Sequence, residues 1–110
     1  MKAPFGGTTR WMAPELLSGD EADSNNIKAS DVYSFGVVLW EINTRQLPYA
    51  NKTDPQVIAL KQQGKHPSLD EHMPMASLIR FCWQKKDNRP TMPQSVGDLE
   101  NDKDLRFNRQ

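Results

Sequence analysis

Apolar residues recur at helical spacing in four stretches of this chain. The longest stretch covers residues 31–44, and its apolar side chains point to nearly every side of a helix: Val32, Phe35, Val37, Val38, Leu39, Trp40 and Ile42. A helix that is apolar nearly all round is predicted to be buried. Ser30 is the predicted N-cap, although the run GVVLW within the stretch would also suit a strand.

Three shorter helices are predicted after it. Residues 54–63 begin with Asp54 as N-cap and Pro55 at the first helical position, and Gly64 follows as C-cap. Residues 74–85 carry one apolar face and residues 93–100 carry another; the two faces consist of Met75, Leu78, Ile79 and Cys82, and of Met92, Val96 and Leu99. Residues 18–30 are turn-rich, and the charged tail 101–110 is expected to fray. The pattern predicts an all-α fold.

Charge and cysteine content narrow the function classes. Fourteen basic residues balance fourteen acidic ones, so there is no electrostatic footprint for nucleic acid or an anionic membrane. Cys82 is the single cysteine, which excludes an intramolecular disulfide and favours a buried, inert thiol. The most apolar run has only 11 residues, 32–42, and is too short to span a bilayer. A cytoplasmic location is expected, or the cytoplasmic side of a membrane if the parent protein is receptor-like.

Four motifs occur in a telling order: GTTRWMAPELL (7–17), KASDVYSFGVVLWEI (28–42), LPYAN (47–51) and FCWQKKDNRPTM (81–92). Together they resemble the second half of the large lobe of a protein kinase, in the tyrosine-kinase-like serine/threonine branch. The resemblance covers about residues 6–101. It implies that residues 1–110 are a partial kinase domain, a helical subdomain of the large lobe that starts with the end of the activation segment at 6–17. One departure is Arg45-Gln46, where a glycine normally ends the central helix.

The resemblance assigns roles to the opening loop. It implies that residues 6–17 form the floor on which a peptide substrate lies, and that Thr8, after Gly7, favours serine or threonine as the phosphoacceptor. Trp11, Met12 and Ala13 would shape the pocket for the residue after the phosphoacceptor. The alternative for Trp11 is an ordinary core aromatic.

Three further residues match structural positions of the family. Glu15 and Arg89 resemble its buried ion pair, in which a planar guanidinium meets a carboxylate through two parallel hydrogen bonds. The alternative is two unrelated surface charges. Asp31 matches an aspartate at the start of the central helix that positions the catalytic loop; without the family it would simply be a first-turn acid favoured by the helix dipole.

The groups that bind nucleotide in this family are not found in the sequence. Phosphoryl transfer uses a phosphate-binding lysine, magnesium-binding carboxylates and an aspartate that orients the nucleophile, and only MKAPF precedes the activation segment. His66 and His72 have no cysteine nearby, so a metal site is not expected. ATP and magnesium therefore belong to the intact family, and we expect this chain to bind neither and to have no catalytic residue.

Three interpretations stay open from the sequence. The chain is a kinase fragment or a pseudokinase remnant, a non-catalytic interaction module using the helix DPQVIALKQQG (54–64), or one half that complements a separate polypeptide. The expected partners are a protein substrate in the intact family, the missing kinase half, or another protein. Because the partners of the central helix are missing, Phe35, Val38, Leu39 and Trp40 are expected to expose apolar surface and to cause self-association.

Overall fold

The computed structural model describes residues 6–17 and 24–100, which form helices and 3-10 turns and contain no strand. A 3-10 turn, η1 (Gly6–Trp11), is followed by α1 (Pro14–Leu17), α2 (Ser24–Thr44), α3 (Asp54–Gln62), α4 (Ala76–Cys82), a second 3-10 turn η2 (Lys86–Asn88) and α5 (Met92–Glu100). The prediction of an all-α fold is confirmed, and the run GVVLW is helical. The opening loop, residues 6–17, contains two short helical turns.

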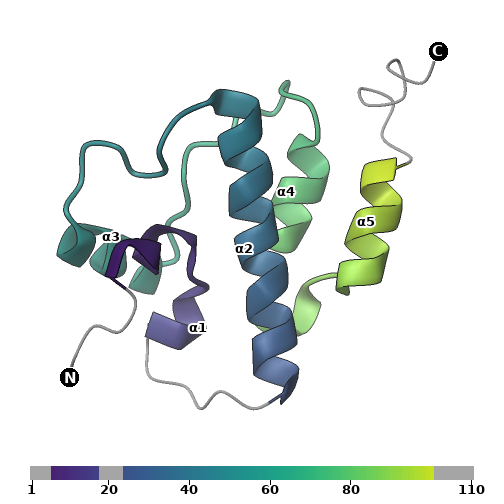
Figure 1. Ribbon diagram of the computed structural model, residues 1–110, viewed down its shortest axis with the longest axis horizontal. Helices are drawn as coiled ribbons and strands as arrows, with labels where there is room; N and C mark the ends of the chain where they lie inside the picture. Colours follow the sequence, from purple (N-terminus) through teal and green to yellow (C-terminus); the bar gives the residue numbers. More distant parts are fainter. Residues whose placement is uncertain (1–5, 18–23, 101–110) are drawn as a thin grey trace.

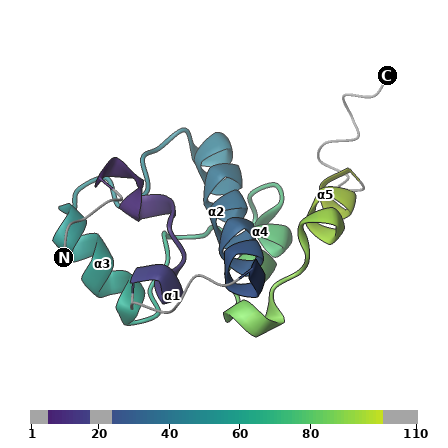
Figure 2. The ribbon, with the colours of Figure 1, turned by 60° about the horizontal axis from the view of Figure 1, so that its bottom comes forward.

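Helix α2 runs through the centre of the molecule (Figure 1). It packs against α4, α5 and η2 on one side, whereas η1 contacts it from the other side and also contacts α3. Figure 2 shows the same order from another direction, with α3 and the opening turns on one side of α2 and α4 and α5 on the other. Helix α2 therefore separates the two halves of the fold and packs against both.

The hydrophobic core lies on both sides of α2. Val32, Tyr33, Val37, Leu39 and Trp40 of α2 are buried. The predicted face of α4 is also buried, comprising Met75, Leu78, Ile79 and Cys82. Apolar burial of this kind contributes about 1.5–3 kcal/mol for each large side chain.

Gly36 sets the distance between α2 and α4. A Cβ placed on Gly36 would lie 2.8 Å from Cys82 Cβ and 2.9 Å from Trp83 Nε1, closer than real Cβ atoms approach other atoms. The helices can therefore pack at this distance only because position 36 has no side chain. The indole nitrogen of Trp83 faces this contact and has no hydrogen-bond partner among the described residues.

Several predicted helix ends were wrong. Helix α2 begins at Ser24 instead of residue 31, so Ser30 lies inside it and is not an N-cap. The N-cap of α3 is Thr53 and not Asp54; its side chain forms a reciprocal capping box with Gln56. Gly64 follows α3 at φ +79°, and its amide and that of Lys65 bond back to α3, as in a Schellman motif.

The expected exposure of the central helix is correct only in part. Val38 is exposed and Phe35 is partly buried, but Leu39 and Trp40 are buried. The Trp40 indole also donates a hydrogen bond of 2.6 Å to the carbonyl of Ser68. Besides Val38, the exposed apolar residues of α2 are Ile27 and Ile42, and the three lie on one side of the helix at a spacing close to whole turns.

Candidate functional site

The opening loop, residues 6–17, lies across α2 and α3 and is held mainly through its backbone. The amide of Met12 donates to the carbonyl of Thr9 at 3.2 Å, and that of Leu16 donates to Ala13 at 3.1 Å. Pro14 begins α1, where its missing N–H would have no helical partner. Three carbonyls of this loop, those of Thr9, Arg10 and Met12, also accept bonds from another element.

Trp11 joins the loop to α2 twice. Its indole N–H donates to Glu41 Oε1 at 3.1 Å, and its carbonyl accepts a bond of 2.7 Å from the hydroxyl of Ser34. The Trp11 and Met12 side chains are only partly buried, whereas Ala13 is fully buried in the core. Of these three predicted residues, Ala13 packs into the core, whereas the side chains of Trp11 and Met12 stay accessible from outside.

Arg10 ties the loop to the turn that follows α2. Its Nη1 donates to the carbonyls of Pro48 at 2.9 Å and Tyr49 at 2.7 Å, and its Nη2 donates to the carbonyl of Lys52 at 2.7 Å. Asp54 lies 3.6 Å from the same guanidinium. A single side chain thus fixes the path of residues 48–52.

Lys61 of α3 anchors the same loop from below. Its side chain is 1% exposed, and its Nζ donates to the carbonyls of Thr9 at 2.8 Å, Arg10 at 2.7 Å and Met12 at 2.6 Å. An ammonium group has three hydrogens, so these three oxygens satisfy it completely. Burial, together with the charge of Arg10, lowers the pKa of Lys61 to about 7.

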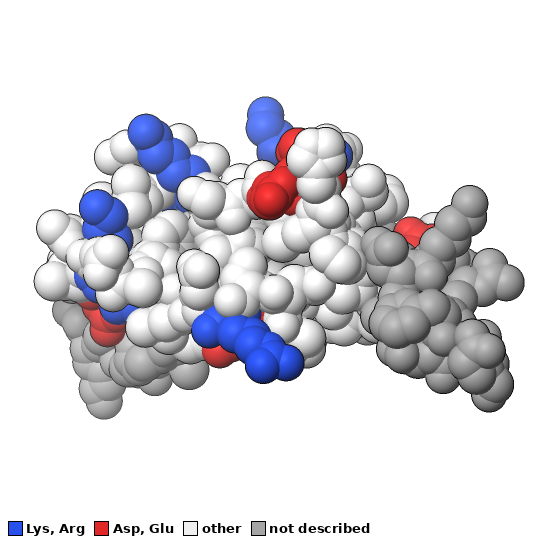
Figure 3. Space-filling view, turned by 90° about the horizontal axis from the view of Figure 1, so that it is seen from above, with Lys and Arg blue, Asp and Glu red and all other residues white. Residues whose placement is uncertain are grey.

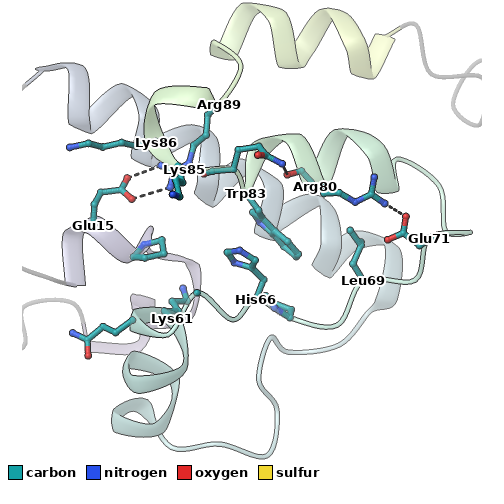
Figure 4. Close-up of a pocket in the computed structure, with 15 residues that line it drawn as sticks. Glu15, Lys61, His66, Leu69, Glu71, Arg80, Trp83, Lys85, Lys86 and Arg89 are labelled. Carbon is teal, nitrogen blue, oxygen red and sulfur yellow. Dashed lines mark hydrogen bonds and ion pairs between the residues drawn. The ribbon is translucent and has the colours of Figure 1, made fainter.

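Glu15 and Arg89 meet in a two-pronged ion pair (Figure 4). Arg89 Nη1 lies 2.7 Å from Glu15 Oε2, and Nη2 lies 2.9 Å from Oε1. The guanidinium also donates to the carbonyls of Ala29 at 3.0 Å and Gln84 at 2.7 Å. The contact joins the opening loop to the segment before α5, 74 residues apart in sequence.

The charges of this pair are largely hidden from water. The side chains of Arg89 and Glu15 are 3% and 9% exposed, and the hydroxyl of Ser30 donates to Glu15 at 2.8 Å. Burial alone would raise the pKa of Glu15, but the hydrogen bonds from Arg89 and Ser30 outweigh it, so the pKa of Glu15 lies below its usual value. Glu15 is therefore charged at neutral pH.

A buried tyrosine lies between the two anchors. Tyr33 Oη is 3.0 Å from His66 Nδ1, and burial raises the pKa of Tyr33. Lys61 Nζ and Arg89 Cζ lie 5.3 Å and 5.2 Å from the centre of its ring, a favourable arrangement for two cations. His66 in turn stacks on Trp83 with ring centres 5.3 Å apart. Lys61 and Arg89 thus both lie over the ring of Tyr33, which clusters with His66 and Trp83.

A cavity of about 850 Å³ opens beside this cluster (Figure 4). His66 and Trp83 lie in its middle, and Arg80, paired with Glu71, lies at one end. Within residues 6–17 and 24–100, no three His, Cys, Asp or Glu side chains are grouped so as to hold a metal ion.

The other predicted residues are placed as follows. Thr8 belongs to η1, but its side chain lies outside the described part of the structure. Asp31 is exposed inside α2, two turns after the helix starts, so the expectation of a first-turn acid was wrong. Cys82 is buried, and burial raises its thiol pKa to about 11, which makes it a poor nucleophile.

Two anchors of the loop were missed by the sequence reasoning. From the sequence, Lys61 belongs to the helix that an interaction module would use, and no role is predicted for Arg10. The available signal was weak: Lys61 lies four residues after Val57, which is buried, so both share one face of α3. A lysine on a buried face needs acceptors, and here the carbonyls of the opening loop supply them.

On the face in Figure 3, basic and acidic side chains lie in small separate groups among uncharged residues, so this face shows no large patch of one charge. In the described ranges, no helix is long and apolar enough to cross a membrane.

Most of this chain is similar to known protein kinases. A family model described as protein tyrosine and serine/threonine kinase matches residues 4–99. The probable serine/threonine-protein kinase drkD of Dictyostelium discoideum is 36% identical over 97 residues, which cover 86% of this chain and 7% of that protein. The serine/threonine/tyrosine-protein kinase HT1 of Arabidopsis thaliana is 37% identical over 98 residues, covering 86% of this chain and 24% of HT1. Human receptor-interacting serine/threonine-protein kinase 1 is 39% identical over 95 residues, covering 80% of this chain and 14% of that protein.

Proposed function

Because this chain belongs to the protein tyrosine and serine/threonine kinase family, we propose that it supplies the peptide-binding floor and helical base of a cytoplasmic kinase that transfers the γ-phosphate of ATP to protein serine or threonine. The observation that carries the proposal is the anchoring of residues 6–13. Arg10, Trp11 and Lys61 fix the backbone of this loop, while the side chains of Trp11 and Met12 stay partly exposed. A fixed backbone with two available apolar side chains suits the binding of an extended peptide.

The same proposal includes inactivity of these 110 residues on their own. Phosphoryl transfer needs a phosphate-binding lysine, bound magnesium and an aspartate that orients the nucleophile. The one buried lysine described here, Lys61, is fully engaged with loop carbonyls and is not available to a phosphate. A thermal-shift titration with ATP and magnesium is expected to leave the melting temperature unchanged, and phosphate incorporation by the pure chain would contradict this part.

A chimera tests the floor itself. Residues 6–99 of this chain replace the corresponding segment of HT1, whose own upstream part supplies the nucleotide-binding groups. We expect the chimera to phosphorylate a generic basic protein on serine and threonine, because the floor binds the peptide and the host performs the transfer. A folded chimera that binds ATP but phosphorylates no protein substrate would refute the proposal. Phosphoamino-acid analysis reads the role assigned to Thr8, since phosphotyrosine as the main product would contradict it.

A second candidate, complementation of a separate polypeptide, is favoured by the exposed apolar side of α2. Ile27, Val38 and Ile42 are exposed on this helix, and clustered apolar surface marks an interface or an aggregation site. In sedimentation, the isolated chain is expected to self-associate. A monodisperse monomer that melts cooperatively would count against an interface on this side.

A further inference from the structure

Two cationic side chains hold the opening loop in a reciprocal arrangement. Lys61 donates from α3 to three carbonyls of residues 9–12, while Arg10, within that same stretch, donates to three carbonyls of residues 48–52. The turn at 48–52 leads directly into α3 through the capping box at Thr53. Contacts therefore connect the loop to the turn, the turn to α3, and α3 back to the loop.

Burying the Lys61 side chain carries a high desolvation cost. An ammonium group loses its hydration on burial, and here its three acceptors are neutral oxygens rather than a carboxylate. A methionine would fill the same volume without that loss. What an apolar side chain cannot do is orient three carbonyls toward one point, and this is the specific contribution of the lysine.

We propose that Lys61 is a positioning residue that locks the peptide-binding floor to α3, so that the floor and α3 form one rigid unit. The peptide-binding role of the loop rests on the proposed function, whereas the attachment of the loop to α3 by Lys61 does not. Its consequence is that peptide affinity depends on a residue whose side chain touches no peptide, because Lys61 is buried beneath the loop.

The groups facing Lys61 come from every element around it. The charge of Arg10, in η1, acts on the Lys61 ammonium. The rings of Tyr33 on α2 and Tyr49 in the following turn lie 5.3 Å and 5.8 Å from its Nζ. His66, in the segment after α3, feels the charge of Lys61 in turn. Burial raises the pKa of Tyr49 to about 12, so both tyrosines are neutral near pH 7 and the cationic groups set the local field.

Hydrogen exchange on the 110-residue chain tests the lock. In Lys61→Met the side chain keeps a similar volume, is one atom shorter and loses all its donors, and Lys65→Met removes an exposed lysine just beyond α3 as the matched control. We expect amides of residues 9–16 to exchange at least tenfold faster in Lys61→Met, with the amides of α4 within twofold of wild type and the control unchanged. Equal acceleration in the loop and in α4 would show a general loss of stability and overturn the proposal, as would an unchanged loop.

A second measurement needs no mutant and covers the case in which Lys61→Met does not fold. In carbon-detected NMR of the wild-type chain, the carbonyl resonances of Thr9, Arg10 and Met12 are expected to titrate together, with the same midpoint as the Lys61 side chain. Independent titrations, or no response to Lys61, would overturn the lock.

The kinase chimera separates this inference from the proposed function. There, Lys61→Met is expected to raise KM for the protein substrate at least fivefold and to leave kcat within twofold, because the lysine acts on the floor and not on the transferred phosphate. An inactive parent chimera would refute the proposed function and leave the exchange result standing. An active chimera whose KM does not change would refute the positioning role alone.

Discussion

Replacing Arg89 with alanine should be one of the most damaging single changes in this chain. The side chain of Arg89 is 3% exposed, and it donates to both carboxylate oxygens of Glu15. Its removal leaves a buried carboxylate with Ser30 as its remaining side-chain donor and two carbonyls, of Ala29 and Gln84, without their guanidinium. Breaking one side of such a pair costs about 3–5 kcal/mol.

The matched control is Arg80→Ala. Arg80 also pairs with a glutamate, Glu71, but the two side chains are 45% and 66% exposed. Water and salt screen an exposed pair, so its loss should cost about 0–1 kcal/mol. Both variants remove an arginine from an ion pair, and burial is the main difference between them.

Thermal unfolding followed by circular dichroism measures the contrast. For a domain of this size, about 3–5 kcal/mol corresponds to a fall in Tm of at least about 10 °C, whereas Arg80→Ala should lower Tm by a few degrees or less. Arg89→Lys should recover little, because an ammonium cannot form two parallel bonds with Glu15. Equal shifts for the two alanine variants would refute the argument from burial.

Three further outcomes are expected from unfolding experiments. Gly36→Ala should destabilise the chain by about 1–3 kcal/mol because its Cβ would meet Cys82 and Trp83. Gly97→Ala in α5, where a Cβ would have nothing within 4 Å, should stabilise it by up to about 1 kcal/mol. Equal effects of the two substitutions would contradict the close packing of α2 on α4. Arg45→Gly should stabilise by about 0.5–1 kcal/mol, since Arg45 follows α2 at φ +56°, and a lower Tm would contradict this. The free energy of unfolding should rise from about pH 7 toward pH 10, and Lys61→Met should remove this rise; identical pH profiles would contradict the burial of a charge at Lys61.

The fold could be predicted from the sequence where packing follows a simple period. The buried face of α4 repeats at three and four residues, and α3 has a proline at its start and a glycine after its end, so both helices were located. The start of α2 was not predicted, because residues 24–31 are mostly polar and carry no apolar period. Tertiary contacts act there instead: Arg89 donates to the carbonyl of Ala29, and Ser30 donates to Glu15.

The site divides in the same way. The contact between Glu15 and Arg89 joins residues 74 apart, and no local pattern could pair them; the prediction came from the family resemblance. Lys61 could not be found by that route, because the motifs quoted for the resemblance stop at residue 51 and resume at residue 81. Its burial depends on where α3 packs, and a lysine in a helix is read from sequence as a solvent-facing residue.

Protonation of Lys61 should move global stability and local order of the loop in opposite directions. The pKa of Lys61 is about 7 in the folded chain and about 10.4 when unfolded, so between these values the unfolded state binds more protons and stability rises with pH. Over the same range, however, the folded side chain changes from an ammonium with three hydrogens to an amine with two. One of the carbonyls of Thr9, Arg10 and Met12 then loses its donor. We therefore expect the free energy of unfolding to rise with pH while the amides of residues 9–12 exchange faster, once exchange rates are corrected for their intrinsic pH dependence. This result would identify a charge that orders the loop and lowers the stability of the fold. If loop and core instead tighten together with rising pH, Lys61 is an ordinary buried side chain.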